Sequence, residues 1–306
     1  MRVQLTDIGG KKNMTIKCAR KTGPGTRLTI ANDRAIASGV GLLAVLVLTA
    51  LPSTSTSVGP LLSTDTLALK TCIERAYPDS IAQVVLKEAR IDHLEMTNGT
   101  TFVWDDGRAK TFEEKLSEPD FEDTLSIPYP THASPPPAKN VDPGRIRLEP
   151  FLRAAYGADQ NAVKKNLIPV RWEPTYRRVS FNKKNGAADA LASVARSLAR
   201  LAPRFRPYLT SIGGTFKWRT IKDTHRLSAH AFGIAIDINV KRSRYWKWTP
   251  RFETAVFPNA TPSAIVDIFE KHHFVWGGKW YHFDTMHFEY RPELFCQVDP
   301  RPRRSM

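Results

Sequence analysis

Apolar residues recur every three or four positions between residues 185 and 201, which is the period of an amphipathic helix. The shared face is formed by four residues: Leu191, Val194, Ala195 and Leu198. Pro203 ends the pattern, because proline lacks the backbone N–H that a helix interior needs. We therefore expect a helix that packs this face against the core.

Residues 233–240 follow the period of a strand, with isoleucine at every second position between 234 and 238. Successive side chains of a strand point to opposite faces, so Asp237 is expected to project away from the isoleucine face. Two shorter segments also predict strands, one at 287–290 and one at 102–104, where a turn at 105–107 follows.

Four further elements follow from apolar spacing and from the positions of glycine and proline. They are a helix at 67–77, a turn that enters a strand at 213–219, a helix at 261–272 and a turn at 276–280. In the helix at 261–272, Thr261 is expected as the N-cap, with Pro262 at the first helical position.

Composition and charge divide the chain into three parts. Prolines cluster between residues 128 and 144, which predicts an extended, poorly packed connector with a domain boundary near it. Residues 1–57 carry a net charge of +6, residues 58–150 carry −6 and residues 151–306 carry +15, the last equal to the total for the chain. The basic C-terminal part suits an anionic partner, such as a cell-wall polymer, a membrane surface or a nucleic acid. Docking of the acidic part on the basic part is the alternative.

Residues 35–51 contain no charged side chain, follow Arg27 and Arg34, and precede a short polar run. This order is typical of a secretion signal or a single membrane anchor, and the apolar stretch is near the lower length limit for a spanning helix. A buried core helix is the alternative.

If the chain is exported, the cysteines that follow the apolar stretch would lie in an oxidising compartment. Cys72 and Cys296 follow the apolar stretch, whereas Cys18 precedes it. In an oxidising compartment the two later cysteines could form one disulfide. Two unrelated buried thiols are the alternative.

The candidate chemistry lies in the last third of the chain. Six residues separate His230 from Asp237, and His287 follows much later. A catalytic zinc ion takes three such protein ligands and keeps one position open for water. Asp284, three residues before His287, could then accept a proton from that water. Neither spacing is specific alone, but together they predict a Zn²⁺-dependent hydrolase.

Glu289 is an alternative to Asp284 as the general base. On a strand, Glu289 points the same way as His287, whereas Asp284 reaches the metal only if residues 283–286 form a turn. We expect Asp284 to be the base and keep Glu289 as the alternative. His282 is a candidate supporting contact.

A cation near the scissile carbonyl would offset charge on the oxyanion. Arg219 is the first candidate, because it is expected to end a strand shortly before the ligand loop, and Arg226 is the second. Ser228 is expected to bond to the loop backbone or to orient a ligand.

The residues Ser228, His230, Gly233, Ala235 and Asp237, followed by Asp284 and His287, resemble the zinc D-alanyl-D-alanine carboxypeptidase family. That family also holds vancomycin-resistance dipeptidases and phage L-alanyl-D-glutamate endopeptidases. Trp218-Arg219 resembles the family's aromatic-arginine strand, and residues 142–147 resemble a segment of one proteobacterial branch. The resemblance covers roughly residues 165–296. Several members carry Glu where this chain has Asp284, which shortens the reach of the base.

The resemblance implies an α+β fold with a small, mostly antiparallel sheet and flanking helices, shared with hedgehog signalling domains. An α/β extension and the N-terminal hydrophobic segment would precede it. The division expected is a basic N-terminus at 1–57, an acidic extension at 58–150 and a zinc peptidase domain at 151–306.

The expected function is an exported zinc metallopeptidase, periplasmic or anchored facing the periplasm, that cuts peptidoglycan stem peptides as a carboxypeptidase or endopeptidase. A zinc-containing cell-wall binding module without turnover is the alternative, but Asp284 and Arg219 together favour catalysis. A nucleic-acid enzyme would explain only the charge, since no nucleic-acid motif is present.

Overall fold

The computed structural model describes residues 64–131, 136–254 and 261–296. All of them belong to one compact unit, Ser57–Met306. The apolar stretch at 35–51 lies outside the described residues. Within the described ranges, no helix is both long enough and apolar enough to cross a membrane.

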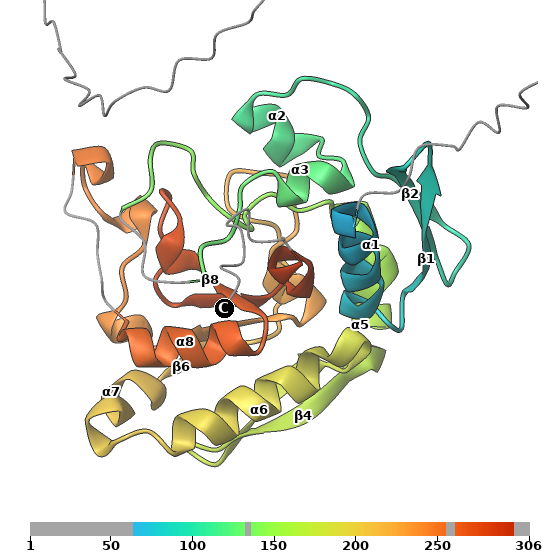
Figure 1. The fold of residues 1–306 in the computed structure, drawn as a ribbon. Coiled ribbons are helices and arrows are strands. Elements are labelled where there is room, and N and C mark those ends of the chain that lie inside the picture. The colour runs from blue at the N-terminus through green and yellow to red at the C-terminus, as the bar shows by residue number, and fades with distance from the viewer. Residues whose placement is uncertain (1–63, 132–135, 255–260, 297–306) are drawn as a thin grey trace, which may run out of the picture. The chain divides into compact units, whose positions relative to one another are not determined.

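Three antiparallel sheets and several helices make an α+β fold (Figure 1). The first sheet holds β1 (Ile81–Lys87), β2 (Arg90–Met96) and β3 (Thr101–Val103), and the second holds β4 (Leu167–Trp172) and β5 (Arg177–Asn182). The third has the order β6-β7-β9-β8, formed by Ile212–Gly214, Ala235–Ile238, His287–Tyr290 and Phe274–Trp276. The helices are α1 (Thr64–Ala76), α2 (Phe112–Ser117), α3 (Phe121–Leu125), α4 (Glu149–Tyr156), α5 (Gln160–Asn166), α6 (Ala187–Ala199), α7 (Arg206–Leu209) and α8 (Ser263–Lys271).

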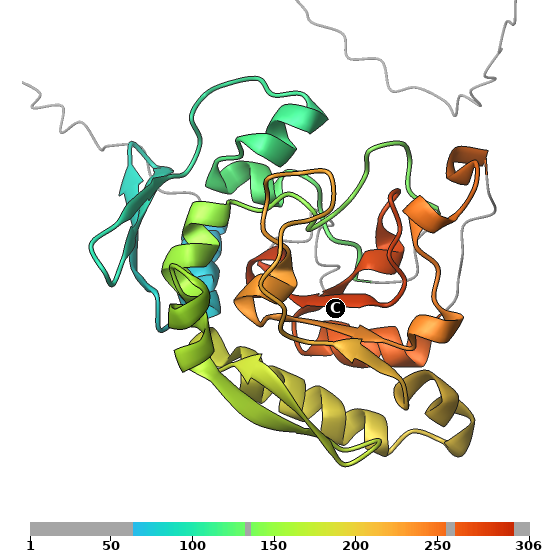
Figure 2. The same cartoon turned by 180° about the vertical axis from the view of Figure 1, so that it is seen from behind.

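Helices cover one face of the four-stranded sheet. In Figures 1 and 2, α8 lies along this sheet, with α6 beyond it beside β4. The ring of Phe269 on α8 stacks on Phe288 of β9 with 3.9 Å between centroids. The alternation in β7 is as predicted, because its isoleucines are fully buried on this side. The opposite face of the sheet is left for polar side chains, among them Asp237.

Most elements predicted from the pattern are present. The segments 67–77, 102–104, 185–201, 233–240 and 287–290 correspond to α1, β3, α6, β7 and β9. The predicted face of α6 is buried along its whole length.

Two predictions were wrong in detail. Within 213–219 the order is the reverse of the one predicted: the strand β6 ends at Gly214, and the residues from 215 to 219, where the strand was expected, form no strand. The last helix begins at Ser263, so Pro262 and not Thr261 occupies the N-cap. The Thr261 hydroxyl instead donates to the carbonyl of Thr285 at 3.1 Å, a long-range contact that sequence spacing does not reveal.

The connector is well packed where it approaches the sheet, which contradicts the prediction of poor packing. Asp142, Pro143 and Gly144 are buried. The Trp280 indole donates to the carbonyl of Pro143 at 2.6 Å, and Arg291 donates to that of Gly144 at 2.6 Å. Side chains from the last third of the chain therefore satisfy the backbone of this proline-rich segment.

Residues on both sides of position 150 share one hydrophobic core. Ile73, Tyr77 and Leu94 belong to the same buried cluster as Leu191 and Phe269. The functional division at residue 150 stays a prediction, but the two segments are packed as one body.

A disulfide joins the two ends of the described chain. Cys72 on α1 is bonded to Cys296, 224 residues later, with 5.5 Å between the Cα atoms. Of the two alternatives that the sequence left open, the structure therefore has the disulfide.

Candidate metal and catalytic site

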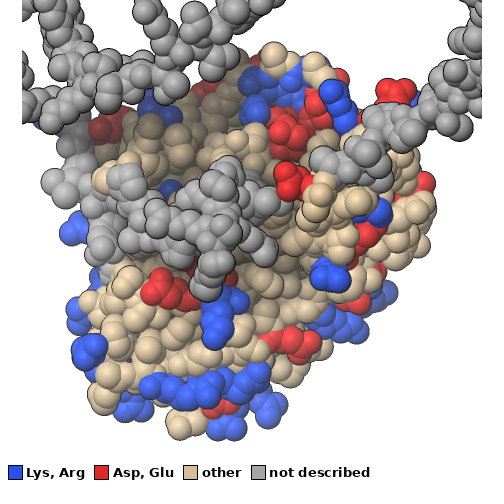
Figure 3. All heavy atoms as spheres, viewed as in Figure 1, with Lys and Arg blue, Asp and Glu red and all other residues tan. Residues whose placement is uncertain are grey.

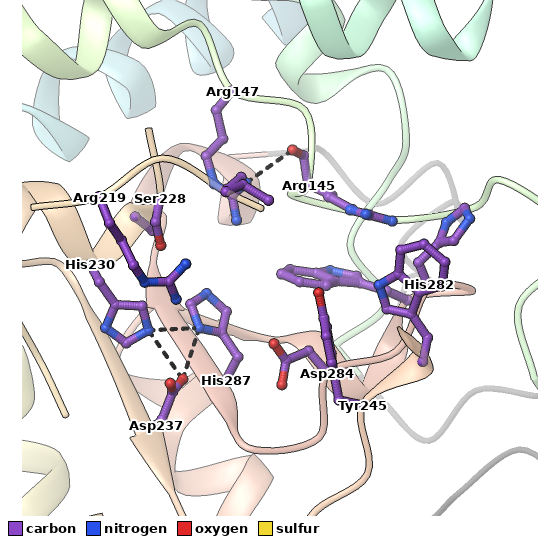
Figure 4. Close-up of a pocket in the computed structure, with 14 residues that line it drawn as sticks. Arg145, Arg147, Arg219, Ser228, His230, Asp237, Tyr245, His282, Asp284 and His287 are labelled. Atoms are coloured by element: carbon purple, nitrogen blue, oxygen red, sulfur yellow. Dashed lines mark hydrogen bonds and ion pairs between the residues drawn. The ribbon is translucent and has the colours of Figure 1, made fainter. Parts of the chain in front are cut away.

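Strand register brings two of the predicted ligands together. In the antiparallel pair β7–β9, Asp237 lies directly opposite His287. Such opposite residues have neighbouring side chains on the same face of the sheet. The Oδ1 atom of Asp237 is 3.0 Å from Nδ1 of His287. A dashed line marks this contact in Figure 4.

A short 3-10 helix, Ala229–Phe232, supplies the third group. Gly233 ends it with φ of 68°, a left-handed conformation that suits glycine. The Nε2 atom of His230 lies 3.1 Å from Oδ1 of Asp237 and 3.2 Å from Nδ1 of His287. Ligand atoms around a tetrahedral zinc ion lie about 3.3 Å from one another. The three groups therefore have the spacing of a zinc site.

The outer nitrogen of each imidazole has an acceptor as its partner. Nδ1 of His230 is 3.1 Å from the carbonyl of Thr215, and Nε2 of His287 is 3.5 Å from a carboxylate oxygen of Glu289. Because these partners only accept, the outer nitrogens carry the protons. When both imidazoles are neutral, their inner nitrogens therefore present lone pairs on the side of Asp237. Three acceptors that converge on one point fit a bound cation, and two imidazoles with one carboxylate are a donor set that zinc takes.

Burial and mutual contacts shift the pKa values of two residues in the triad formed by His230, Asp237 and His287. Burial alone would raise the pKa of Asp237, but the neighbouring His230 and His287 hold it well below its usual range. Burial alone would lower the pKa of His287, but its contacts with Asp237 and Glu289 raise it to about 10. Metal ligands must be deprotonated, so binding of a cation between these groups would be coupled to the release of protons.

Asp284 lies beside the triad, in the turn that its prediction required. The backbone N–H of His287 donates to the carbonyl of Asp284 at 3.2 Å, and an isolated bridge pairs Asp284 with Tyr245. The Asp284 carboxylate points into the pocket (Figure 4). Its Oδ1 atom is buried with no hydrogen-bond partner among the described residues. Burial raises the pKa of Asp284 to about 6.

Glu289, the rival base, lies behind His287 and does not line the pocket. It is fully buried and forms an ion pair with Arg147, whose Nε is 2.7 Å from its Oε1. Burial alone would raise the pKa of Glu289, but Arg147 holds it far below its usual range. This geometry argues against Glu289 as the base.

Arg219 lines the pocket and points into it (Figure 4). It does not end a strand as predicted. Instead it opens a narrow hairpin, in which Thr220 pairs with Leu227 and the N–H of Ser228 donates to the carbonyl of Arg219 at 3.1 Å. This hairpin places Arg219 next to the His230 helix. In the described ranges, no carboxylate forms an ion pair with Arg219.

Ser228 and Arg226, the other two candidate residues of the hairpin, differ in their position relative to the pocket. Ser228 lines the pocket and joins the loop through its backbone, whose carbonyl accepts from the N–H of Ala231 at 2.8 Å. Arg226 is absent from the pocket lining. Burial, then the nearby Arg147 and Arg145, lowers the pKa of Arg226 to about 10.

Sequence reasoning missed the contribution of the connector, which in the structure is taken to extend through residue 147 to the start of α4. Arg145 and Arg147 both line the pocket, together with Tyr245, Trp246, Trp280 and His282. His282 had been a candidate contact, but its partner Asp142, 2.6 Å from Nδ1, had not been identified. The available signal was the charged run at 142–147 inside a proline-rich segment.

A family model described as D-alanyl-D-alanine carboxypeptidase, one of the M15 peptidases, matches residues 222–290. The match covers less than half of the chain, but it includes His230, Asp237, Asp284 and His287. No curated protein and no solved structure gives a significant match. The matched segment is similar to these carboxypeptidases, which suggests peptidase activity.

Proposed function

We propose that this protein is a zinc-dependent peptidase that hydrolyses peptide bonds in peptidoglycan stem peptides. The observation that carries the proposal is the convergence of His230, Asp237 and His287 beside Asp284, whose Oδ1 atom has no hydrogen-bond partner among the described residues. The family match over the same residues supports the class of reaction.

Five polar groups of the pocket have a role in this proposal. His230, Asp237 and His287 would hold a Zn²⁺ ion, which would supply a Lewis acid and make a water molecule more acidic. Asp284 accepts the proton from the attacking water and returns it to the leaving amine. Arg219 faces the developing negative charge on the carbonyl oxygen.

The charge of the pocket suits a peptide that carries carboxylates. Arg147 is neutralised by Glu289, and Arg145 shares Asp142 with His282. Arg219 forms no ion pair with a carboxylate among the described residues, so its positive charge is available to a ligand in the pocket. A peptide substrate with a free carboxylate would balance it.

Export to the periplasm and contact with the cell wall are parts of the same proposal. The disulfide is typical of an oxidising compartment. Basic side chains are also gathered on the surface near α6 and β4 (Figure 3). The exposed arginines of this region are Arg171, Arg177, Arg178, Arg196, Arg200, Arg204 and Arg206. They would favour an anionic wall polymer, and we propose no nucleic-acid partner.

Mass spectrometry of purified muropeptides tests the proposal. The zinc-loaded protein is expected to release D-alanine or to split the stem peptide, and the mass change identifies the bond. Treatment with a chelator should stop the reaction, and added zinc should restore it. The His230→Ala variant serves as the control for contaminating peptidases. Stoichiometric zinc without any cleavage would instead indicate a binding module, and absence of zinc binding would refute the metal site.

A further inference from the structure

Arg147 reaches the metal-site region from a part of the chain that the family match does not include. It belongs to the connector before α4, whereas the match begins at residue 222. Its side chain is only 9% exposed. Its guanidinium contacts both oxygens of Glu289, with Nε at 2.7 Å from Oε1 and 3.0 Å from Oε2.

Glu289 in turn contacts the proposed ligand His287. The two residues are two positions apart on β9, so their side chains share a face. Oε2 of Glu289 is 3.5 Å from Nε2 of His287, and the opposite ring nitrogen faces Asp237. The carboxylate therefore determines which nitrogen keeps the proton and how the ring is oriented.

A second cation, Arg291, also approaches Glu289, but its contact at 3.4 Å is longer. Arg291 forms its main ion pair with Glu293 and donates to the carbonyls of Gly144 and Ile146. Arg147 is thus the residue that fixes the position of the Glu289 carboxylate, because its planar guanidinium contacts both carboxylate oxygens.

We propose that Arg147 is a positioning residue for the metal site: through Glu289 it holds the His287 imidazole with Nδ1 directed at the metal. The inference rests on the proposed zinc site. It assigns to the connector a role in metal binding that residues 222–290 alone do not supply.

Metal affinity, measured by competition with a chelator, tests the proposal independently of turnover. Arg147→Gln is expected to weaken zinc binding about 10- to 100-fold, the usual effect of losing such a supporting contact. The electronic absorption spectrum of the cobalt-substituted protein should also change, because the ligand geometry relaxes. Arg147→Lys, which keeps the charge without the fork, should recover part of the affinity. Arg171→Gln, on an exposed ion pair with Glu173, is the matched control and should bind zinc like the wild type.

A double-mutant cycle separates this role from a general structural one. If Arg147 acts through Glu289, Arg147→Gln should cost much less affinity in a Glu289→Gln background than alone. Native zinc affinity and an unchanged cobalt spectrum in a folded Arg147→Gln variant would overturn the proposal. If that variant does not fold, the zinc affinity of Glu289→Gln is measured instead, because glutamine keeps the shape of the side chain. Native zinc affinity in Glu289→Gln would also overturn the proposal. Failure of the wild type itself to bind zinc would instead refute the proposed function.

Discussion

Two carboxylates near His287 have opposite environments. Asp284 is buried with an unpartnered oxygen, and burial raises its pKa to about 6. Glu289 is equally buried but paired with Arg147, which lowers its pKa. Divergent environments of this kind distinguish a group that exchanges protons from one that stays ionised. Asp284 is therefore suited to proton transfer and Glu289 to support.

Substitution of Asp284 should separate zinc binding from turnover. Asp284→Ala is expected to keep one zinc per chain and to lose a factor of about 10² or more in kcat, because the base is gone and the ligands remain. His230→Ala should lose zinc and activity together. Metal content and kcat are measured on the same preparations.

Asp223→Ala is the control for this pair, because the Asp223 side chain is 67% exposed and pairs only with Lys247 among the described residues. It should behave like the wild type in both measurements. Wild-type turnover in Asp284→Ala would show that another group is the base.

Asp142 should make the stability of the fold depend on pH. It is fully buried and accepts from the backbone N–H of His282 at 2.9 Å and from Arg145 at 2.8 Å. Burial would raise its pKa, but His282 and Arg145 lower it below the usual value. A carboxyl whose pKa is lower in the folded than in the unfolded protein stabilises the fold at pH values above its unfolded pKa of about 3.9. This stabilisation is lost as the pH falls through the pKa of the folded state.

The Asp142→Asn variant provides the comparison. At neutral pH it should be less stable by about 1.5–3 kcal/mol, the usual range for a hydrogen bond to a charged group. The difference in the free energy of unfolding between wild type and variant should shrink as the pH falls below about 4. Urea unfolding at several pH values measures it, and a constant difference would contradict the assignment.

At the scale of elements, the sequence predicted β7 and β9 but not their pairing. The isoleucine alternation places Asp237 on the polar face of its strand, and His287 starts a strand that the pattern also indicates. Nothing local reveals that these two residues lie opposite each other across β7–β9, because register depends on distant packing. The family resemblance supplied the grouping, and the structure supplies its cause.

The contacts of the connector lay beyond sequence reasoning for a similar reason. Proline content predicts extended backbone, and the backbone there is irregular. Whether such a segment is exposed or buried depends on the donors that face it, here Trp280 and Arg291. Those donors stand about 140 residues later, as sequence separations of 137 and 147 show.

Gly277 keeps the turn that carries Asp284 in place. The N–H of Asp284 donates to the carbonyl of Gly277 at 2.9 Å. A Cβ at position 277 would lie 2.6 Å from the carbonyl oxygen of Asp284 and 3.2 Å from its Cβ. Because backbone has to move, Gly277→Ala is expected to displace the base, lower kcat by about tenfold or more and leave zinc content unchanged. At Gly107 the φ of 73° strains any residue with a Cβ, but the added Cβ meets nothing within 4 Å, so Gly107→Ala tests whether backbone strain in a distant loop is enough to lower kcat.

The disulfide between α1 and the C-terminal 3-10 helix, Pro292–Phe295, should stabilise the whole fold. It closes a loop of more than 200 residues, with a sequence separation of 224. The Cys72→Ser/Cys296→Ser variant is expected to lose about 2–5 kcal/mol. Thermal unfolding under non-reducing conditions measures the loss. Equal stability of wild type and variant would show that packing alone holds α1.

At the scale of the molecule, the extension is part of the body that holds the site. The hydroxyl of Tyr77 donates to Glu293 at 2.6 Å, and Glu293 pairs with Arg291, which contacts Glu289. A chain of buried polar contacts therefore runs from α1 to the carboxylate behind His287. The acidic segment 58–150 cannot be removed without leaving buried charges unpaired, which is costly in an interior.

Truncation tests this dependence. A fragment of residues 151–296 retains all three proposed ligands but lacks Tyr77, Arg147 and the backbone carbonyls that Arg291 uses. It is expected to have little near-ultraviolet circular dichroism, to bind a hydrophobic dye and to bind zinc much more weakly than a fragment of residues 64–296. The longer fragment should unfold cooperatively, because it contains the complete core. If the shorter fragment unfolds cooperatively with native zinc affinity, the peptidase domain begins near residue 150 and the extension is a separate attachment.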